Sequence, residues 1–307
     1  MTLFAIILAL AIDQAKPLPA MRVEAWLRAY GLFLEGRFNA GERHQGLAAW
    51  FAGAAAPAAL VLVLQMLLAV FGHPLLSLAL GVGVLYLTMG FRQFSHFFTD
   101  IHLALRMGEL DRARQLLAAW RGGSTSHLGS NEVARLAIEE ALTASHRHVF
   151  APLFWFVVLG PAGVLLYRLS LAFQRQWGGR RDAEFGDFGA FAAQAFAALD
   201  WLPVRATAAS FAVVGDFEDA VYCWRNQAQR WPERGTGILL ASGAGALGVR
   251  LGMPVREDGD MADRPELGLG DEADADFMQS TIGLVWRSLV MALFVLALLW
   301  VASWVGA

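Results

Sequence analysis

The chain has 307 residues, of which 57% are apolar and 17% are charged, and its mean hydropathy is +0.46. Soluble domains carry about a quarter charged residues, so this composition favours a membrane protein over a soluble enzyme. The formal net charge of −3 excludes the strongly basic surface of a nucleic-acid-binding protein, and the single cysteine, Cys223, excludes an intrachain disulfide and a multi-cysteine metal site.

The first element expected in chain order is a short helix over residues 1–12. This segment has neither the basic start nor a convincing small-residue cleavage site of a signal peptide. It is also shorter than the roughly 20 residues that carry a helix across a bilayer. We therefore expect it to stay in the protein as a partly inserted helix.

Four uncharged segments approach the length of a membrane-spanning helix, which is about 20 apolar residues. They cover residues 47–71, 74–91, 149–167 and 289–307. Gly160-Pro161 predicts a kink in the third of them. Buried helices of a large soluble protein are the alternative, but several of these runs are longer than a core helix needs. The sequence thus predicts an all-α fold, a polytopic helical membrane protein with a single domain over residues 1–307.

Helical loop regions are expected between these spans, over residues 13–46, 92–148 and 168–288. Amphipathic helices with one apolar packing face are expected at residues 23–35, 103–120 and 217–231. The first two loop regions hold five and seven Lys and Arg residues, so we expect them on the cytoplasmic side. The third region holds 12 Arg, and its side stays open because a long loop can cross regardless of its charge.

Two shorter apolar segments, residues 206–215 and 236–249, lie within the third loop region. They are too short to span and are expected to be re-entrant, interfacial or packed against the bundle. The second segment contains Gly243, Gly245 and Gly248. These glycines permit two helices to approach closely, and a flexible glycine-rich loop is the open alternative.

Candidate metal ligands form two groups, and neither has the spacing of a metal site. His146 and His148 lie just before a span, and their two-residue spacing places them on different sides of a helix. We expect them to form a polar, solvated cluster at the membrane edge. Residues 257–276 carry nine acids and one base, Arg264, without the spacing of an EF-hand. The sequence therefore predicts a solvated, mobile loop there and no metal site.

Seven stretches, taken in chain order, together resemble one family. They are Met1-Thr-Leu-Phe4, Gly108-Glu-Leu-Asp-Arg-Ala-Arg114, Ala151-Pro-Leu-Phe-Trp155, Gly160-Pro161 with Tyr167-Arg168, Leu199-Asp-Trp-Leu-Pro-Val-Arg205, Gly245-Ala-Leu-Gly-Val-Arg-Leu-Gly252 and Thr281-Ile-Gly-Leu-Val-Trp286. In this order they resemble the CobD/CbiB membrane proteins of cobalamin biosynthesis, along essentially the whole chain. The first, third and fifth stretches look closer still to AmpE, a related inner-membrane protein associated with β-lactamase regulation.

The resemblance implies a ligase that uses ATP and magnesium to join adenosylcobyric acid to an aminopropanol phosphate. Such chemistry needs acids to hold the metal and bases to hold phosphate. In this chain the family's polar motifs fall on positions that lack those acids, at residues 122–125, 143–144, 147–148, 171–174 and 196–197. Arg114, Glu139 and Arg205 are kept. We expect these three to converge near the membrane edge, with Glu139 close to one of the arginines.

Three functions compete on these residues. Because acids are missing at separate motifs while packing residues remain, we favour a non-catalytic, AmpE-like signalling or accessory protein of the bacterial inner membrane, with no catalytic residue assigned. The alternatives are the adenosylcobinamide-phosphate synthase, or a membrane enzyme or carrier for another phosphate- or lipid-linked substrate. The expected partners are the lipid bilayer and a membrane or cytoplasmic protein, not nucleic acid. No cofactor is expected, except ATP and Mg²⁺ if the synthase hypothesis holds.

Overall fold

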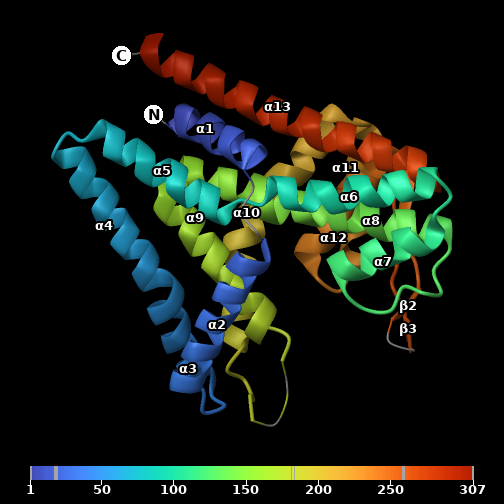
Figure 1. Cartoon of the computed structure of the whole chain (residues 1–307), viewed down its shortest axis with the longest axis horizontal. Coiled ribbons are helices and arrows are strands. Elements are labelled where there is room, and N and C mark those ends of the chain that lie inside the picture. The colour runs from blue at the N-terminus through green and yellow to red at the C-terminus, as the bar shows by residue number, and fades with distance from the viewer. Residues whose placement is uncertain (1, 17–19, 181, 183, 258–259, 306–307) are drawn as a thin grey trace. The chain divides into compact units, whose positions relative to one another are not determined.

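Figure 1 shows the computed structural model of the chain, which describes residues 2–16, 20–180, 182, 184–257 and 260–305. The chain divides into two compact units. The first unit comprises Met1–Phe91 and His148–Pro203, and the second comprises Arg92–Arg147 and Val204–Ala307. The expectation of one domain over residues 1–307 stays a prediction.

The first unit is built from helices. They are α1 (Thr2–Ala15), α2 (Ala20–Phe38), α3 (Arg43–Trp50), α4 (Ala56–Val70), α5 (Pro74–Thr88), α9 (Ala151–Trp177) and the first part of α10 (Ala190–Val214), with a π-helical turn at Phe51–Ala55. The central element is α9, which packs against α1, α2, α4 and α5. At its end, Phe173 and Trp177 stack on each other, and Phe185 and Phe188 of the following turn complete this buried aromatic core.

The kink predicted at Gly160-Pro161 is present in α9. Gly160 has φ +63°, a left-handed conformation that glycine adopts without the steric penalty of a Cβ. Pro161 has no backbone N–H to continue the helical hydrogen bonds. Gln65 of α4 lies against Gly160, so that a Cβ at this position would overlap its amide group. The kink therefore bends α9 and also makes room for a polar side chain of the neighbouring helix.

The second unit surrounds one buried helix, α8 (Ser130–Ser145). Its other helices are α6 (Phe91–Arg106), α7 (Leu110–Arg121), the second part of α10, α11 (Phe217–Asn226), α12 (Arg234–Leu247) and α13 (Ala275–Val305). A short η turn lies at Ala228–Arg230, and the η turn His146–Phe150 begins in this unit and ends in the first. Helices α7, α12 and α13 all pack against α8. This coverage explains why twelve of its residues are buried, Arg135 and Glu139 among them.

The all-α, polytopic prediction is confirmed. In the described part of the chain, four helical stretches are long and apolar enough to cross a membrane: Arg43–Val70, Ser130–Trp177, Ala190–Val214 and Ala275–Ala302. The first, second and fourth contain or overlap the predicted spans 47–71, 149–167 and 289–307. The predicted span 74–91 forms only the 15-residue helix α5, which ends at Thr88, because Met89 adopts an extended conformation.

The stretch Ala190–Val214 was missed as a span, since only residues 206–215 were recognised as apolar. Asp200 and Arg205 interrupt its apolar pattern. The structure accommodates Asp200 within the first unit, where Tyr167 donates its hydroxyl to Asp200 Oδ1 at 2.9 Å. A polar group with such a partner costs less to remove from water, so it does not end an apolar helix.

The glycine-rich segment 236–249 is a helix and not a flexible loop. Ten consecutive residues of α12, from Gly237 to Ala246, are buried. A Cβ at Gly243 would meet Leu142 of α8 at 2.7 Å, and a Cβ at Gly245 would overlap the backbone of Asp219 in α11. Close approach of helices is thus what Gly243 and Gly245 permit. Gly248 has a different role, because its φ of +66° and the open space around it make it the left-handed cap that ends α12.

The acidic segment 257–276 contains strands, which corrects the prediction of a loop. Strand β1 (Val249–Gly252) pairs antiparallel with β4 (Glu266–Leu267) and parallel with β5 (Asp271–Glu272), and β2 (Val255–Glu257) pairs antiparallel with β3 (Asp260–Ala262). Leu251 and Leu267 lie opposite each other and are both fully buried. The burial of this pair holds β4, and with it part of the acidic segment, against β1. Residues 258–259 lie outside the described residues.

Candidate functional site

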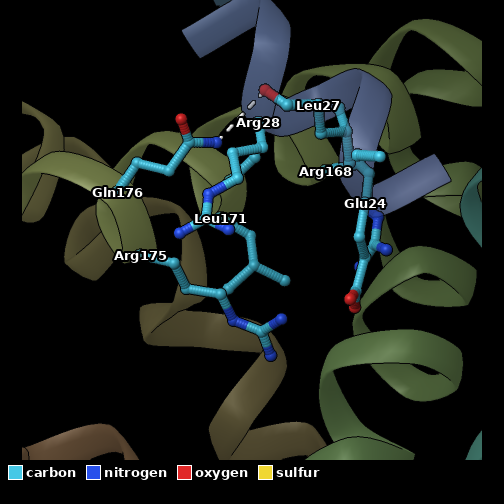
Figure 2. Close-up of a pocket in the computed structure, with 9 residues that line it drawn as sticks. Glu24, Leu27, Arg28, Arg168, Leu171, Arg175 and Gln176 are labelled. Carbon is cyan, nitrogen blue, oxygen red and sulfur yellow. Dashed lines mark hydrogen bonds between the residues drawn. The ribbon is translucent and has the colours of Figure 1, made fainter. Parts of the chain in front are cut away.

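A pocket of about 430 Å³ opens in the first unit, where α2 packs against the C-terminal part of α9. Figure 2 shows its polar walls. It is lined by Glu24, Ala25, Leu27, Arg28, Arg168, Leu171, Ala172, Arg175 and Gln176. Its volume falls in the range of about 300–1,000 Å³ that is typical of small-molecule sites.

Helical spacing explains why these side chains share the pocket. Arg168, Leu171, Ala172 and Arg175 follow one another at i, i+3, i+4 and i+7, which places them on one face of α9. Glu24, Leu27 and Arg28 have the same relationship on α2. Gln176 of α9 forms a hydrogen bond to α2, because its Nε2 donates to the carbonyl oxygen of Leu27 at 3.1 Å.

Arg168 is the buried cation of this pocket. Only 7% of the residue is exposed, and its Nη1 lies 3.0 Å from Nδ1 of His148. Its Nε is buried and has no hydrogen-bond partner among the described residues. A buried guanidinium donor without a partner is costly, so burial of Arg168 beside the pocket calls for a functional explanation.

The pocket has an excess of positive charge. Among the described residues, its lining holds three arginines, Arg28, Arg168 and Arg175, and one carboxylate, Glu24. Arg175 and Glu24 both lie within electrostatic reach of Arg168. Two guanidinium groups that repel each other in one cavity are stabilised when an anion lies between them. The pocket therefore suits an anionic group of a ligand, and the Glu24 carboxylate suits a cationic group of the same ligand.

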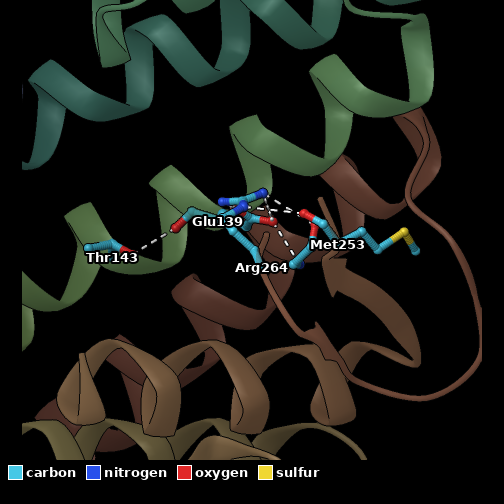
Figure 3. A network of polar contacts seen from close by, with 5 residues as sticks. Glu139, Thr143, Met253 and Arg264 are labelled. Carbon is cyan, nitrogen blue, oxygen red and sulfur yellow. Dashed lines mark hydrogen bonds and ion pairs between the residues drawn. The ribbon is translucent and has the colours of Figure 1, made fainter. Parts of the chain in front are cut away.

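A second polar network lies in the second unit and involves Glu139 (Figure 3). Arg264 Nη1 donates to Glu139 Oε2 at 2.8 Å, and Gly252 N donates to Glu139 Oε1, also at 2.8 Å. Arg264 also donates to the carbonyl oxygens of Gly252 and Met253, at 3.2 and 3.3 Å. The side chains of Arg264 and Glu139 are only 11% and 8% exposed. The network ties the end of β1 to α8, which is a structural role.

Glu139 forms its ion pair with neither Arg114 nor Arg205, and the convergence of these three residues stays a prediction. Glu139 has an arginine partner, but it is Arg264, which lies in the segment predicted to be a solvated loop. Arg114 donates its Nε to the carbonyl oxygen of Leu128 at 2.8 Å and pairs with Asp111 at its own helix start. Arg205 lies in α10, within electrostatic reach of Arg234.

His146 and His148 contact different partners and do not converge. His146 is 2% exposed, and its Nδ1 lies 2.9 Å from Oγ1 of Thr207 in the second unit. His148 contacts Arg168 in the first unit. The expected solvated cluster is wrong for His146, since the helices around it exclude water. In the described part of the chain, no group of three or more His, Cys, Asp or Glu side chains could hold a metal ion.

The comparison with protein families decides the membership of this chain. A family model described as CobD/Cbib protein matches residues 3–285. The chain belongs to the CobD/CbiB family.

Relatives of known name come from several bacteria. The chain is 37% identical over 273 residues to the cobalamin biosynthesis protein CobD of Stutzerimonas stutzeri. The aligned residues cover 86% of this chain and 86% of the relative. The chain is 36% identical over 216 residues to the protein of that name from Chromobacterium violaceum, covering 70% of this chain and 69% of the relative. The CobD protein of Photorhabdus laumondii is 29% identical over 202 residues, or 64% of this chain and 63% of the relative. No solved structure matches the chain significantly.

These relatives correct the favoured function. The hypothesis of a non-catalytic, AmpE-like signalling protein is wrong, because the similar chains carry the name of a cobalamin biosynthesis protein. That hypothesis gave most weight to a few motif positions where acids are missing. The comparison instead counts every position of a long alignment, 273 residues in the first of these relatives.

Proposed function

We propose that this chain is an adenosylcobinamide-phosphate synthase of cobalamin biosynthesis, which joins adenosylcobyric acid to an aminopropanol phosphate through an amide bond. The match of the family model over residues 3–285 and the two relatives named CobD at 37% and 36% identity support this proposal. In the structure, the observation that carries it is the α2–α9 pocket, whose lining has the charges that such a substrate needs.

An aminopropanol phosphate carries a cationic amino group at one end and an anionic phosphate at the other. The pocket offers the guanidinium groups of Arg28, Arg168 and Arg175 to the phosphate and the carboxylate of Glu24 to the amino group. Opposite charges at the two ends would fix the direction in which the substrate binds. The amino group would then point consistently to one side of the pocket, which is what attack on a carboxyl carbon requires.

The proposal implies ATP and Mg²⁺, because a carboxylate must be activated before an amine can displace its oxygen. The residues present do not fit a resident magnesium ion. A magnesium ion held by the protein alone needs several oxygen ligands, whereas Leu171 and Ala172 are apolar and Glu24 is the one carboxylate among the described lining residues. The residues of this site therefore account for the binding and orientation of the phosphate-bearing amine, and not for the activating step.

The bacterial inner membrane is the proposed location, with the pocket open to the cytoplasm, where ATP is available. Glu24 and Arg28 belong to the loop region 13–46, whose five Lys and Arg residues favour the cytoplasmic side. Both ligands of the proposed reaction would then reach the site without crossing the bilayer.

A complementation experiment tests the proposal. The chain is expressed in a bacterial strain that lacks its own synthase, and growth that depends on cobalamin is measured. We expect wild-type chain to restore growth, and Arg168→Gln to lower it because the pocket loses its buried cation. Arg37→Gln is the matched control, since Arg37 is an exposed α2 residue outside the pocket lining. No growth with wild-type chain that is present in the membrane would overturn the proposal.

A further inference from the structure

We infer that the second unit contains a strap with two positions, and that Glu139 changes its arginine partner when the strap opens. The strap comprises the described residues 253–257 and 260–265, which connect β1 to β4. With the strap closed, Glu139 of α8 pairs with Arg264 of the strap, as in this structure. With the strap open, Glu139 pairs with Arg135 of its own helix. This movement is independent of the reaction proposed above.

Arg135 is a buried cation whose donors lack a partner while the strap is closed. Only 7% of the residue is exposed, and its Nε and Nη2 are buried without a hydrogen-bond partner among the described residues. Arg135 precedes Glu139 by four residues, so the two side chains share a face of α8 and can reach each other. Arg135 also lies within electrostatic reach of both Glu139 and Arg264. The carboxylate therefore lies between two cations and forms its ion pair with Arg264.

The backbone at Met253 is strained while the strap is closed. Its φ is +65°, a left-handed conformation that a residue with a Cβ adopts at an energetic cost, and no other non-glycine residue of the described chain has a positive φ. Arg264 holds this conformation, because it donates to the carbonyl oxygens of Gly252 and Met253 at 3.2 and 3.3 Å. Release of Arg264 allows Met253 to relax, which favours the open position.

The two ends of the strap are anchored, so it can move as a loop on a fixed base. Leu251 of β1 and Leu267 of β4 lie opposite each other and are fully buried. Gly252 donates its N–H to Glu139 Oε1 at 2.8 Å and adds a contact at the base. Among the described residues, the hydrogen bonds and ion pairs from the strap to α8 all come from Arg264 (Figure 3). One side chain therefore holds the strap closed.

The exchange of partners lowers the cost of opening. A carboxylate left in the interior without a counter-charge is strongly destabilising, so the departure of Arg264 alone would be costly. Arg135 supplies the replacement from the same helix, and the exchange also satisfies its buried donors. Glu139 thus has one ion pair in either position, and Arg264 enters water when the strap opens. Two arrangements that balance in this way form a two-state element.

A double-mutant cycle in the full chain tests the exchange. Thermal unfolding in detergent is measured for wild type, Arg135→Met, Arg264→Gln and the double variant. With Arg264 present, Arg135→Met should raise the unfolding temperature or lower it by less than about 2 °C, because it removes buried donors that have no partner. In the Arg264→Gln background, the same change should lower it by about 6 °C or more, because Glu139 then loses its remaining counter-charge.

The difference between the two backgrounds decides the result. Arg135→Met effects that agree within about 2 °C in both backgrounds would overturn the exchange, because Arg135 would then act without regard to Arg264. Arg112→Gln is the matched control, since it removes an exposed arginine of α7 in the same unit, and its effect should be the same in both backgrounds. An Arg264→Gln chain that does not fold would also overturn the exchange, because Arg135 should replace the lost cation.

A lysine variant keeps the test decisive if the double variant does not fold. Arg135→Lys retains the cation, so Arg264→Gln should fold with lysine at position 135 even where it fails with methionine. Failure of both double variants would contradict the exchange.

Hydrogen exchange locates the movement. Arg264→Gln should accelerate exchange in a peptide covering residues 250–257 by about tenfold or more, while residues 130–145 of α8 stay protected. Equal acceleration in both peptides would show that the whole unit opens and that there is no separate strap.

Discussion

Glu139 of α8 and Arg264, which follows it by 125 residues, form an ion pair with a distance of 2.8 Å from Oε2 to Nη1. Both side chains are almost inaccessible to solvent. Glu139→Gln keeps the size of the side chain but leaves the guanidinium without its counter-charge. We expect this change to lower the free energy of unfolding by about 3 kcal/mol, as is usual when one partner of a buried pair is removed.

The measurement is thermal unfolding in detergent, monitored through tryptophan fluorescence. Trp231 can report on the pair, because its ring lies 5.4 Å from the Arg264 guanidinium. Glu109→Gln is the matched control, since Glu109 pairs with Arg112 on an exposed surface. Exposed pairs contribute about 0–1 kcal/mol. Equal losses for the two variants would mean that the buried pair does not anchor β1 to α8.

Gly245 tests the packing of α12 against α11. A Cβ at this position would overlap the backbone of Asp219 and Ala220, so Gly245→Ala must separate the two helices. We expect a loss of about 2 kcal/mol, within the range for overpacked interiors. Gly283 of α13 has open space around it, and Gly283→Ala should stabilise its helix by up to about 1 kcal/mol. A Gly245→Ala variant as stable as wild type in thermal unfolding would contradict the packing.

Cys223 provides a prediction about pH. The residue is fully buried, and burial raises the pKa of its thiol from 9.0 to about 11, because the thiolate is disfavoured away from water. The folded state therefore holds the thiol proton more tightly than the unfolded state does. The stability that this provides is fully present below pH 9 and is lost as the pH rises through about 11. At pH 8 only about one thiol in a thousand is ionised.

Labelling by a maleimide measures this effect. In the native protein at pH 8, Cys223 should react far more slowly than after unfolding in detergent such as dodecyl sulfate, since unfolding restores both access and the ordinary pKa. Labelling at the same rate in both states would show that the thiol is accessible and not held by α11 and its neighbours.

Topology can be tested with the same chemistry, because Cys223 gives little background. Ser124 and Arg37 are exposed residues of regions expected on the cytoplasmic side. Ser124→Cys and Arg37→Cys should resist an impermeant thiol reagent in intact cells and react after the cells are opened. Rapid labelling of both in intact cells would reverse the predicted orientation of residues 13–46 and 92–148.

Much of the helical framework was predictable because it depends on local pattern. The uncharged runs gave most of the spanning helices, and Gly160-Pro161 gave the position of the kink. The missed helix α10 shows the limit of that pattern. Asp200 looks like a charge that ends an apolar run until the hydroxyl of Tyr167, 33 residues away, is known to satisfy it.

The candidate site was less predictable, since it depends on which helices meet. The spacing of Arg168 and Arg175 shows that they share a face of α9, and the spacing of Glu24 and Arg28 shows the same for α2. No local signal indicates that these faces meet across about 140 residues of sequence. The partner of Glu139 was missed for the same reason, because Arg264 lies in a segment whose strands are only two to four residues long.

The central claim is that this chain forms the amide bond between adenosylcobyric acid and an aminopropanol phosphate. The most direct measurement supplies purified chain in nanodiscs with both substrates, ATP and Mg²⁺, and follows the product by mass spectrometry. We predict product that increases with time and protein concentration, with Arg168→Gln slower by about tenfold or more and Arg37→Gln unchanged. Substrates that remain unconverted by folded wild-type chain, under conditions in which a bona fide CobD synthase converts them, would contradict the claim.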